Sequence, residues 1–168
     1  MIFVTVGSAW QPFARLLEAM DELAPRLGEP VIMQTGFWGY RGRNTRCVGY
    51  VTFNEVQDFV ASCRVLIGHG STGPVLMARR YGKPLVMVPR LPELGETADA
   101  HPLQAAEFVE RQGSRMVEVV YDIRQLEAAV RRAQAKADQG LTYEPDPGRE
   151  RLLAAVKAAV EGREIPPP

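Results

Sequence analysis

The centre of this sequence reads Val65-Leu66-Ile67-Gly68-His69-Gly70-Ser71-Thr72-Gly73-Pro74, an apolar segment that passes through a glycine-rich turn into a helical pattern. A short segment without a polar face is typical of a strand in a parallel sheet that helices cover on both sides. Leu85-Val86-Met87-Val88 repeats the apolar pattern between two prolines. Buried strands joined by helical stretches predict an α/β fold.

The rest of the chain alternates in the same way between short apolar segments and longer stretches with helical spacing. This alternation predicts βαβ crossovers and a mostly parallel sheet. We expect a Rossmann-like, doubly wound sheet of six strands in the order 3-2-1-4-5-6, with ligands bound at the carboxyl ends of its strands near strands one and four. The expected strands are residues 2–6, 30–35, 46–51, 65–68, 85–88 and 115–120, and the expected helices are residues 12–27, a short segment capped by Asn54, 74–81, 102–112, a segment capped by Asp122, and 149–160.

The composition indicates one globular domain. Of 168 residues, 46% are hydrophobic and 24% charged, and 20 basic residues balance 20 acidic ones. We expect a single domain over residues 1–162 and a disordered, proline-rich tail over residues 163–168. The balanced charge argues against a nucleic-acid partner. No secretory signal opens the chain and no apolar run approaches the ~20 residues of a membrane span, so we expect a cytoplasmic protein.

The cysteines and histidines offer little for metal binding. Cys47 and Cys63 are expected to be buried, reduced thiols, the usual state in cytosolic proteins. His69 and His101 are the only histidines. A metal site usually needs about three or four donors close together, so we expect none here.

The glycine-rich turn is a candidate anion site. The three glycines within Gly68–Gly73 let the backbone approach a ligand closely, and Pro74 suits the first position of a helix. The free N–H groups of that helix start, together with Ser71 and Thr72, are expected to bind an anion such as a diphosphate. The turn lacks the lysine of a P-loop. His69 either points at the same anion or makes internal hydrogen bonds.

The loops after the first and fifth strands carry further candidates. Gly7 and Ser8 either form a bare strand-to-helix turn or contact the ligand. Residues 89–96 are too many for a simple connector, and long loops of this kind are often functional. Within them, Arg90 either pairs with phosphate or is an ordinary surface arginine.

Two more segments have alternative interpretations. Asp99, His101 and Gln104 lie around the next helix start, where they either bind sugar hydroxyls or cap the helix. The aromatic and basic loop at residues 36–43 contains Phe37-Trp38-Gly39-Tyr40. Exposed aromatic residues beside arginines favour a protein interface, whereas aromatic residues folded back onto the sheet would belong to the core.

Several motifs, taken in order, resemble the C-terminal, donor-binding domain of glycosyltransferase family 28. The resemblance covers about residues 1–135, and its closest type is the stand-alone catalytic subunit, as in the cytosolic subunit of the dolichol-linked UDP-GlcNAc transferase and in bacterial exopolysaccharide glycosyltransferases. The motifs are Ile2-Phe3-Val4-Thr5-Val6-Gly7-Ser8, Gly49-Tyr50 before the Asn54 helix, Gly68-His69-Gly70-Ser71-Thr72-Gly73, Gly82-Lys83-Pro84, and Val88-Pro89-Arg90 with Gly95-Glu96 and His101 downstream.

The resemblance implies one half of a GT-B fold in an inverting glycosyltransferase that takes a UDP-sugar as donor and needs no metal or other cofactor. It implies uracil contacts from Val51-Thr52-Phe53 and diphosphate contacts from the glycine-rich turn. The acceptor-binding half is not in this sequence, so the resemblance also implies a membrane-anchored partner that binds the acceptor and recruits the chain to the inner face of the membrane. A homo-oligomer is left open.

Two departures from the family pattern bear on the sugar end of the donor. Relatives place a glutamate for the donor ribose where this chain has Met77. They also read Asp-His-Gln before the next helix, where this chain has Asp99-Ala100-His101-Pro102-Leu103-Gln104. Either Glu96 or Gln104 replaces the missing contacts, or the protein is a non-catalytic nucleotide-sugar-binding or regulatory subunit.

Overall fold

A parallel six-stranded sheet in the order β3-β2-β1-β4-β5-β6 forms the centre of the structure and confirms the predicted topology. The structure, a computed structural model, describes residues 1–144, 147–161 and 163. Strand β1 pairs with β2 on one side and with β4 on the other, so Ile2 lies between Val31 and Val65. The strands are β1 (Ile2–Thr5), β2 (Val31–Gln34), β3 (Arg46–Val48), β4 (Val65–His69), β5 (Leu85–Val88) and β6 (Val117–Val119).

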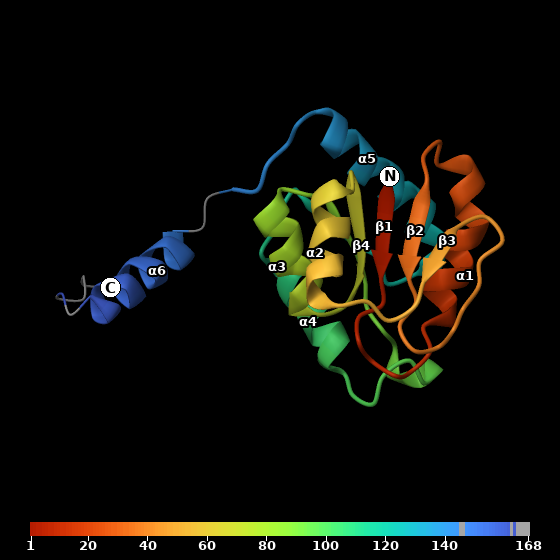
Figure 1. Cartoon of the computed structure of the whole chain (residues 1–168), viewed down its shortest axis with the longest axis horizontal. Coiled ribbons are helices and arrows are strands. Elements are labelled where there is room, and N and C mark those ends of the chain that lie inside the picture. Colours follow the sequence, from red (N-terminus) through yellow and green to blue (C-terminus); the bar gives the residue numbers. More distant parts are fainter. Residues whose placement is uncertain (145–146, 162, 164–168) are drawn as a thin grey trace.

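Helices cover both faces of the sheet (Figure 1). Successive strand residues point to opposite faces, so Val4 packs in a cluster with α1 and α5, whereas Phe3 packs in a cluster with α2, α3 and α4. This double burial explains why the strands show no polar face. The helices are α1 (Ala14–Leu23), α2 (Phe53–Ser62), α3 (Thr72–Tyr81), α4 (His101–Arg111), α5 (Leu126–Asp138) and α6 (Pro147–Val160), with short 3-10 turns at Ala24–Arg26, Pro92–Leu94 and Ile123–Gln125.

Helix α2 begins earlier than predicted. Thr52, and not Asn54, is its N-cap: the Thr52 hydroxyl accepts from the Glu55 N–H, and the Glu55 carboxylate accepts from the Thr52 N–H in return. This capping box satisfies two amides at once, which an Asn54 cap would leave unpaired. Strand β3 correspondingly ends at Val48 instead of Val51. Residues 49–51 are therefore loop residues at the carboxyl end of the sheet.

Helix α3 also begins earlier than predicted, with Ser71 as its N-cap and Thr72 as its first residue. Pro74 consequently occupies the third helical position and not the first. Proline has no N–H, so it removes one of the amides that a helix start normally leaves free.

The two cysteines differ in burial. Both thiols are free, but only Cys63 is buried, whereas Cys47 is half-buried. Burial raises the pKa of Cys63 to about 11.

Helix α6 lies apart from the sheet in Figure 1, so one domain over residues 1–162 stays a prediction. Of the predicted tail, residues 164–168 lie outside the described residues. Within the described ranges, no helix has the length and apolar character that crossing a membrane requires.

Candidate functional site

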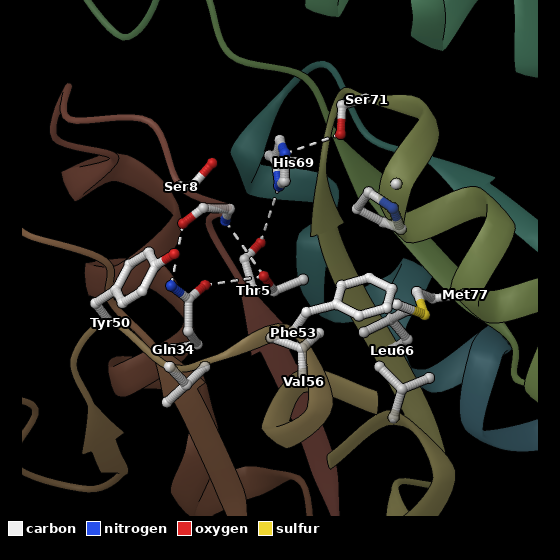
Figure 2. A pocket seen from close by; sticks show the side chains of 15 residues that line it. Thr5, Ser8, Gln34, Tyr50, Phe53, Val56, Leu66, His69, Ser71 and Met77 are labelled. Carbon is white, nitrogen blue, oxygen red and sulfur yellow. Dashed lines mark hydrogen bonds between the residues drawn. The ribbon is translucent and has the colours of Figure 1, made fainter. Parts of the chain in front are cut away.

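A cavity of about 390 Å³ opens at the carboxyl ends of β1, β2 and β4, between the N-terminal parts of α2 and α3 (Figure 2). It lies where the strand order reverses between β1 and β4, the position at which doubly wound sheets bind ligands. Its lining consists of Thr5, Gly7, Ser8, Gln34, Tyr50, Val51, Phe53, Val56, Val60, Leu66, His69, Ser71, Gly73, Pro74 and Met77.

The structure brings half of the predicted donor-binding residues together around this cavity. Those that line it are Gly7, Ser8, Val51, Phe53, His69, Ser71 and Gly73. The others, which do not line it, are Thr52, Gly70, Thr72, Arg90, Glu96, His101 and Gln104. Their binding roles stay predictions, and several of them have other contacts that are described below.

The start of α3 presents two free amides beside the cavity. The Ser71 N–H already donates to the His69 carbonyl at 2.8 Å, and Pro74 has no N–H to offer. Ser71 makes no side-chain cap, and no described residue accepts from Thr72 or Gly73 outside the helix. A Cβ added to Gly73 would meet nothing closer than the Ser71 Oγ at 3.8 Å, so the approach is open. Free amides at a helix N-terminus attract anions.

His69 makes internal hydrogen bonds through both ring nitrogens, which is the second of its two predicted roles. Its Nδ1 lies 3.4 Å from the Thr5 carbonyl, which can only accept, so Nδ1 carries the proton. Nε2 then accepts from the Ser71 hydroxyl at 2.8 Å. The ring lies over Gly7, where an added Cβ would come within 2.5 Å of its Cε1 carbon. Gly7 also has a φ of +76°, so both the turn and the ring require glycine.

Burial lowers the pKa of His69; the hydrogen bond to the Thr5 carbonyl opposes this effect, the Arg90 charge adds to it, and the resulting pKa is about 4. The folded protein therefore binds fewer protons at His69 than the unfolded chain between about pH 6.5 and pH 4. Neutral His69 stabilises the fold above this range, and the contribution is lost as the pH falls through it.

The free energy of unfolding should fall by on the order of 3 kcal/mol from this residue alone between pH 6.5 and pH 4. Chemical denaturation at a series of pH values measures it. A His69→Asn variant provides the reference, because its other titrating groups are the same. The wild-type curve should converge on the variant curve as the pH falls. Parallel curves would contradict the assignment.

Gln34 fixes the loop after β1, although the sequence analysis did not select it. It is only 3% exposed, and its Oε1 accepts from the Thr5 hydroxyl at 2.9 Å and from the Val6 N–H at 3.2 Å. Its Nε2 donates to the Gly7 carbonyl at 3.0 Å. Both polar atoms of the Gln34 side chain thus have at least one partner, as buried polar groups usually do. The one sequence signal was a polar residue that ends the apolar segment Val31–Gln34.

The side of the cavity between α2 and α3 is apolar. Phe53, Val56, Leu66, Pro74 and Met77 contribute to it, and Figure 2 shows Met77 beside the Phe53 ring, with Leu66 and Val56 below the ring. Among the described residues that line the cavity, none is an aspartate, glutamate, lysine or arginine. The described residues also contain no cluster of histidine, cysteine and acidic side chains that could hold a metal ion.

Arg90 lies inside the protein and is only 3% exposed, so its interpretation as a surface arginine is wrong. Its guanidinium donates to the carbonyls of Val6 at 3.0 Å, Gln11 at 3.0 Å and Glu96 at 2.8 Å. The guanidinium carbon lies over the Phe13 ring, 4.6 Å from the ring centroid. These donors hold the loops after β1 and β5 together, whereas the buried Nε of Arg90 has no hydrogen-bond partner. A contact of Arg90 with phosphate stays a prediction.

Glu96 is part of the same buried network. Its carboxylate accepts from Arg15 at 2.9 Å and 2.8 Å and from the Leu91 N–H at 2.9 Å. The pair is almost fully enclosed, with side-chain exposures of 14% for Arg15 and 6% for Glu96. Glu96 therefore anchors the loop after β5 to helix α1, which differs from its predicted role in sugar recognition.

Gly70 lets three backbone segments pack closely together. An added Cβ would lie 2.6 Å from the Pro102 carbonyl oxygen and 2.8 Å from the Pro89 Cα, both backbone atoms that cannot yield easily. Glycine thus lets the turn after β4 pass close to α4. At the start of that helix, the Asp99 carboxylate accepts from the His101 N–H at 3.0 Å, in agreement with the capping interpretation for Asp99. His101 and Gln104 are exposed on α4.

The aromatic loop beside the cavity is partly exposed and partly folded back. Phe37 stacks on Tyr50 with ring centroids 4.8 Å apart, and Phe37 is 64% exposed. Trp38 stacks on Tyr40, which packs against the core. The part around Tyr40 is therefore folded back onto the core, whereas an interface role for the exposed residues stays a prediction.

Asp21 holds the end of the aromatic loop. Its carboxylate accepts from the Arg43 N–H at 2.8 Å, the Asn44 N–H at 3.0 Å and the Thr45 hydroxyl at 2.6 Å. Burial works to raise the pKa of Asp21, but the hydrogen bonds from Thr45, Arg43 and Asn44 outweigh it and keep the pKa below its usual value. The loop that carries the aromatic residues is thus fixed to α1.

Comparison with known proteins agrees with this geometry. The model of the glycosyltransferase family 28 C-terminal domain matches residues 1–156, and the chain belongs to this family. No curated protein matches the sequence.

Solved structures show the same fold. CalG4, the calicheamicin glycosyltransferase, and the spinosyn forosaminyltransferase SpnP each share 22% sequence identity with this chain at a TM-score of 0.57. In both comparisons the match covers 83% of this chain and 36% of the other, so the chain spans little more than a third of either enzyme. The fold is therefore the Rossmann-like half of a GT-B glycosyltransferase.

Proposed function

We propose that this domain is the donor-binding catalytic half of an inverting glycosyltransferase and that it binds a UDP-sugar in the cavity between α2 and α3. The observation that carries the proposal is the pair of free amides at Thr72 and Gly73, beside a cavity that is otherwise uncharged. Such a site favours a diphosphate, because the helix N-terminus supplies positive potential without a cationic side chain. Tyr50 and Phe53 offer aromatic surfaces on which a uracil ring can stack.

In the proposed reaction, an acceptor hydroxyl attacks the anomeric carbon of the donor from the face opposite the diphosphate. The bond between that carbon and the diphosphate oxygen breaks, and UDP leaves with the electron pair. The Thr72 and Gly73 amides stabilise the charge that develops on the leaving group. The acceptor proton must pass to a base. His69 is not suited to this role, since its Nε2 lone pair already accepts from Ser71.

The base is proposed to come from a membrane-anchored partner that binds the acceptor and holds this domain at the inner face of the membrane. Exposed aromatic residues support a partner surface here: Tyr50 and Phe53 line the cavity, and Phe37 stacks on Tyr50. Trp10, two residues after Ser8, is 77% exposed. Large exposed aromatic side chains are typical of interface cores.

A second candidate function is a non-catalytic nucleotide-sugar-binding or regulatory subunit. The observation that favours it is the absence of any carboxylate or free imidazole among the described residues that line the cavity. Such a subunit would bind the donor without turnover in any pairing.

Calorimetric titration with UDP and UMP tests the proposal. We expect UDP to bind at least about tenfold more tightly than UMP, because only UDP presents a second phosphate to the α3 amides. Transfer from a UDP-sugar should then require a candidate membrane-anchored partner. Binding without transfer in any pairing would favour the regulatory subunit, and no binding of UDP would exclude both functions.

A further inference from the structure

The cavity has two chemically different halves. The half near β1 and β2 is polar, with Thr5, Ser8 and Gln34, whereas the half between α2 and α3 is apolar, with Met77 at its side. The free amides of Thr72 and Gly73 begin α3, the helix that also carries Met77. A ligand anchored there therefore extends along a wall without charge.

The pentose of a nucleoside diphosphate would lie along this wall. If the diphosphate binds at Thr72 and Gly73 and the base stacks at Phe53, the pentose bridges the two positions and faces Pro74 and Met77. Figure 2 shows the Met77 side chain beside the ring of Phe53. Met77 is half-buried and packs against the core cluster around Leu66, so it forms a fixed part of the wall.

This wall has few polar partners for the hydroxyls of a pentose. Methionine sulfur is a weak acceptor, and proline and leucine side chains have none. The hydroxyl of Ser71, the N-cap of α3, donates to His69. Ser8 and Gln34 lie across the cavity from Met77 (Figure 2), and the Gln34 amide already bonds to Thr5, Val6 and Gly7. A pentose hydroxyl placed here would lose water and gain little in return, which is unfavourable.

We propose, on the basis of the proposed function, that this site does not recognise the 2′-hydroxyl of the donor nucleotide. It accepts 2′-deoxyribonucleoside diphosphates at least as well as ribonucleoside diphosphates. The substrate class of the enzyme thus includes sugars activated by deoxyribonucleotides. A site built to hydrogen-bond a hydroxyl rejects the analogue that lacks it by orders of magnitude, whereas an apolar site does not.

Calorimetric titration of the wild-type protein with UDP and dUDP tests the proposal, because the two ligands differ only in the 2′-hydroxyl. We expect dUDP to bind at least as tightly as UDP and at most about tenfold more tightly. UDP binding more than about threefold more tightly than dUDP would overturn the inference and leave the proposed function standing. Binding of neither nucleotide would overturn the proposed function and this inference with it.

A matched pair of variants tests whether the pentose lies against Met77. Met77→Glu places an acceptor on the wall and should make UDP bind about tenfold more tightly than dUDP. Leu76→Glu adds the same charge to the same helix on an exposed residue outside the cavity and should leave the ratio unchanged. An unchanged ratio in a folded Met77→Glu variant would overturn the placement of the pentose. The wild-type comparison tests the proposal even if this variant does not fold.

Discussion

Replacing Ser71 with aspartate is expected to lower the affinity for UDP by about a hundredfold or more while leaving the domain folded. Aspartate is a favoured N-cap residue, so its carboxylate can accept from the Gly73 N–H at the start of α3. It would then occupy a donor that the diphosphate needs and add a negative charge beside it. Both effects oppose binding, whereas the cap itself stabilises the helix. Calorimetric titration with UDP measures the affinity.

Two further variants separate these causes. Ser71→Ala loses the hydrogen bond to His69 but leaves both amides of α3 free, so its affinity for UDP should fall less than about tenfold. Ser62→Asp makes the same charge change at an exposed residue at the end of α2, away from the cavity, and should bind UDP as the wild type does. If Ser71→Asp retained wild-type affinity, the start of α3 would not be the diphosphate site.

The strand order could be predicted because it depends on local patterns. Segments such as Leu85–Val88 are apolar throughout, and a chain that alternates such segments with helices has few ways to fold. The position of the cavity followed from the same order, since it lies where the order reverses. Element boundaries were less predictable. Thr52 and Asn54 are both good caps by residue type, and only the reciprocal bond with Glu55 selects Thr52.

The roles of individual polar residues could be predicted only in part, because their partners are distant in sequence. Arg90 looked like a phosphate ligand at a strand end, but the carbonyls of Val6 and Gln11, about eighty residues away, accept from its guanidinium. Gln34 seemed an ordinary strand residue, although it organises the loop after β1. Gly70 looked like a ligand contact and proved to be required by the backbones of two other segments.

Replacing Glu96 with alanine is expected to lower the free energy of unfolding by about 3–5 kcal/mol, the largest stability effect predicted for this chain. The substitution removes both oxygens that pair with Arg15 and the acceptor of the Leu91 N–H. Among the described residues, Arg15 would keep one hydrogen bond, to the Pro89 carbonyl at 2.8 Å, and its place over the Phe13 ring, and its Nη1 already lacks a partner. A buried cation without its counter-charge costs far more than a lost surface ion pair. Chemical denaturation followed by circular dichroism measures the change.

Glu93 in the same loop provides the control, because it is exposed and carries the same side chain. Glu93→Ala should change the free energy of unfolding by less than about 0.5 kcal/mol, as substitutions of exposed residues usually do. Glu96→Gln keeps the shape but loses the charge, so its destabilisation should fall between the two. If Glu96→Ala cost less than about 1 kcal/mol, the Arg15–Glu96 pair would not anchor the loop after β5. The position of Arg90, which also donates to the Glu96 carbonyl, would then have to depend on the loop after β1 alone.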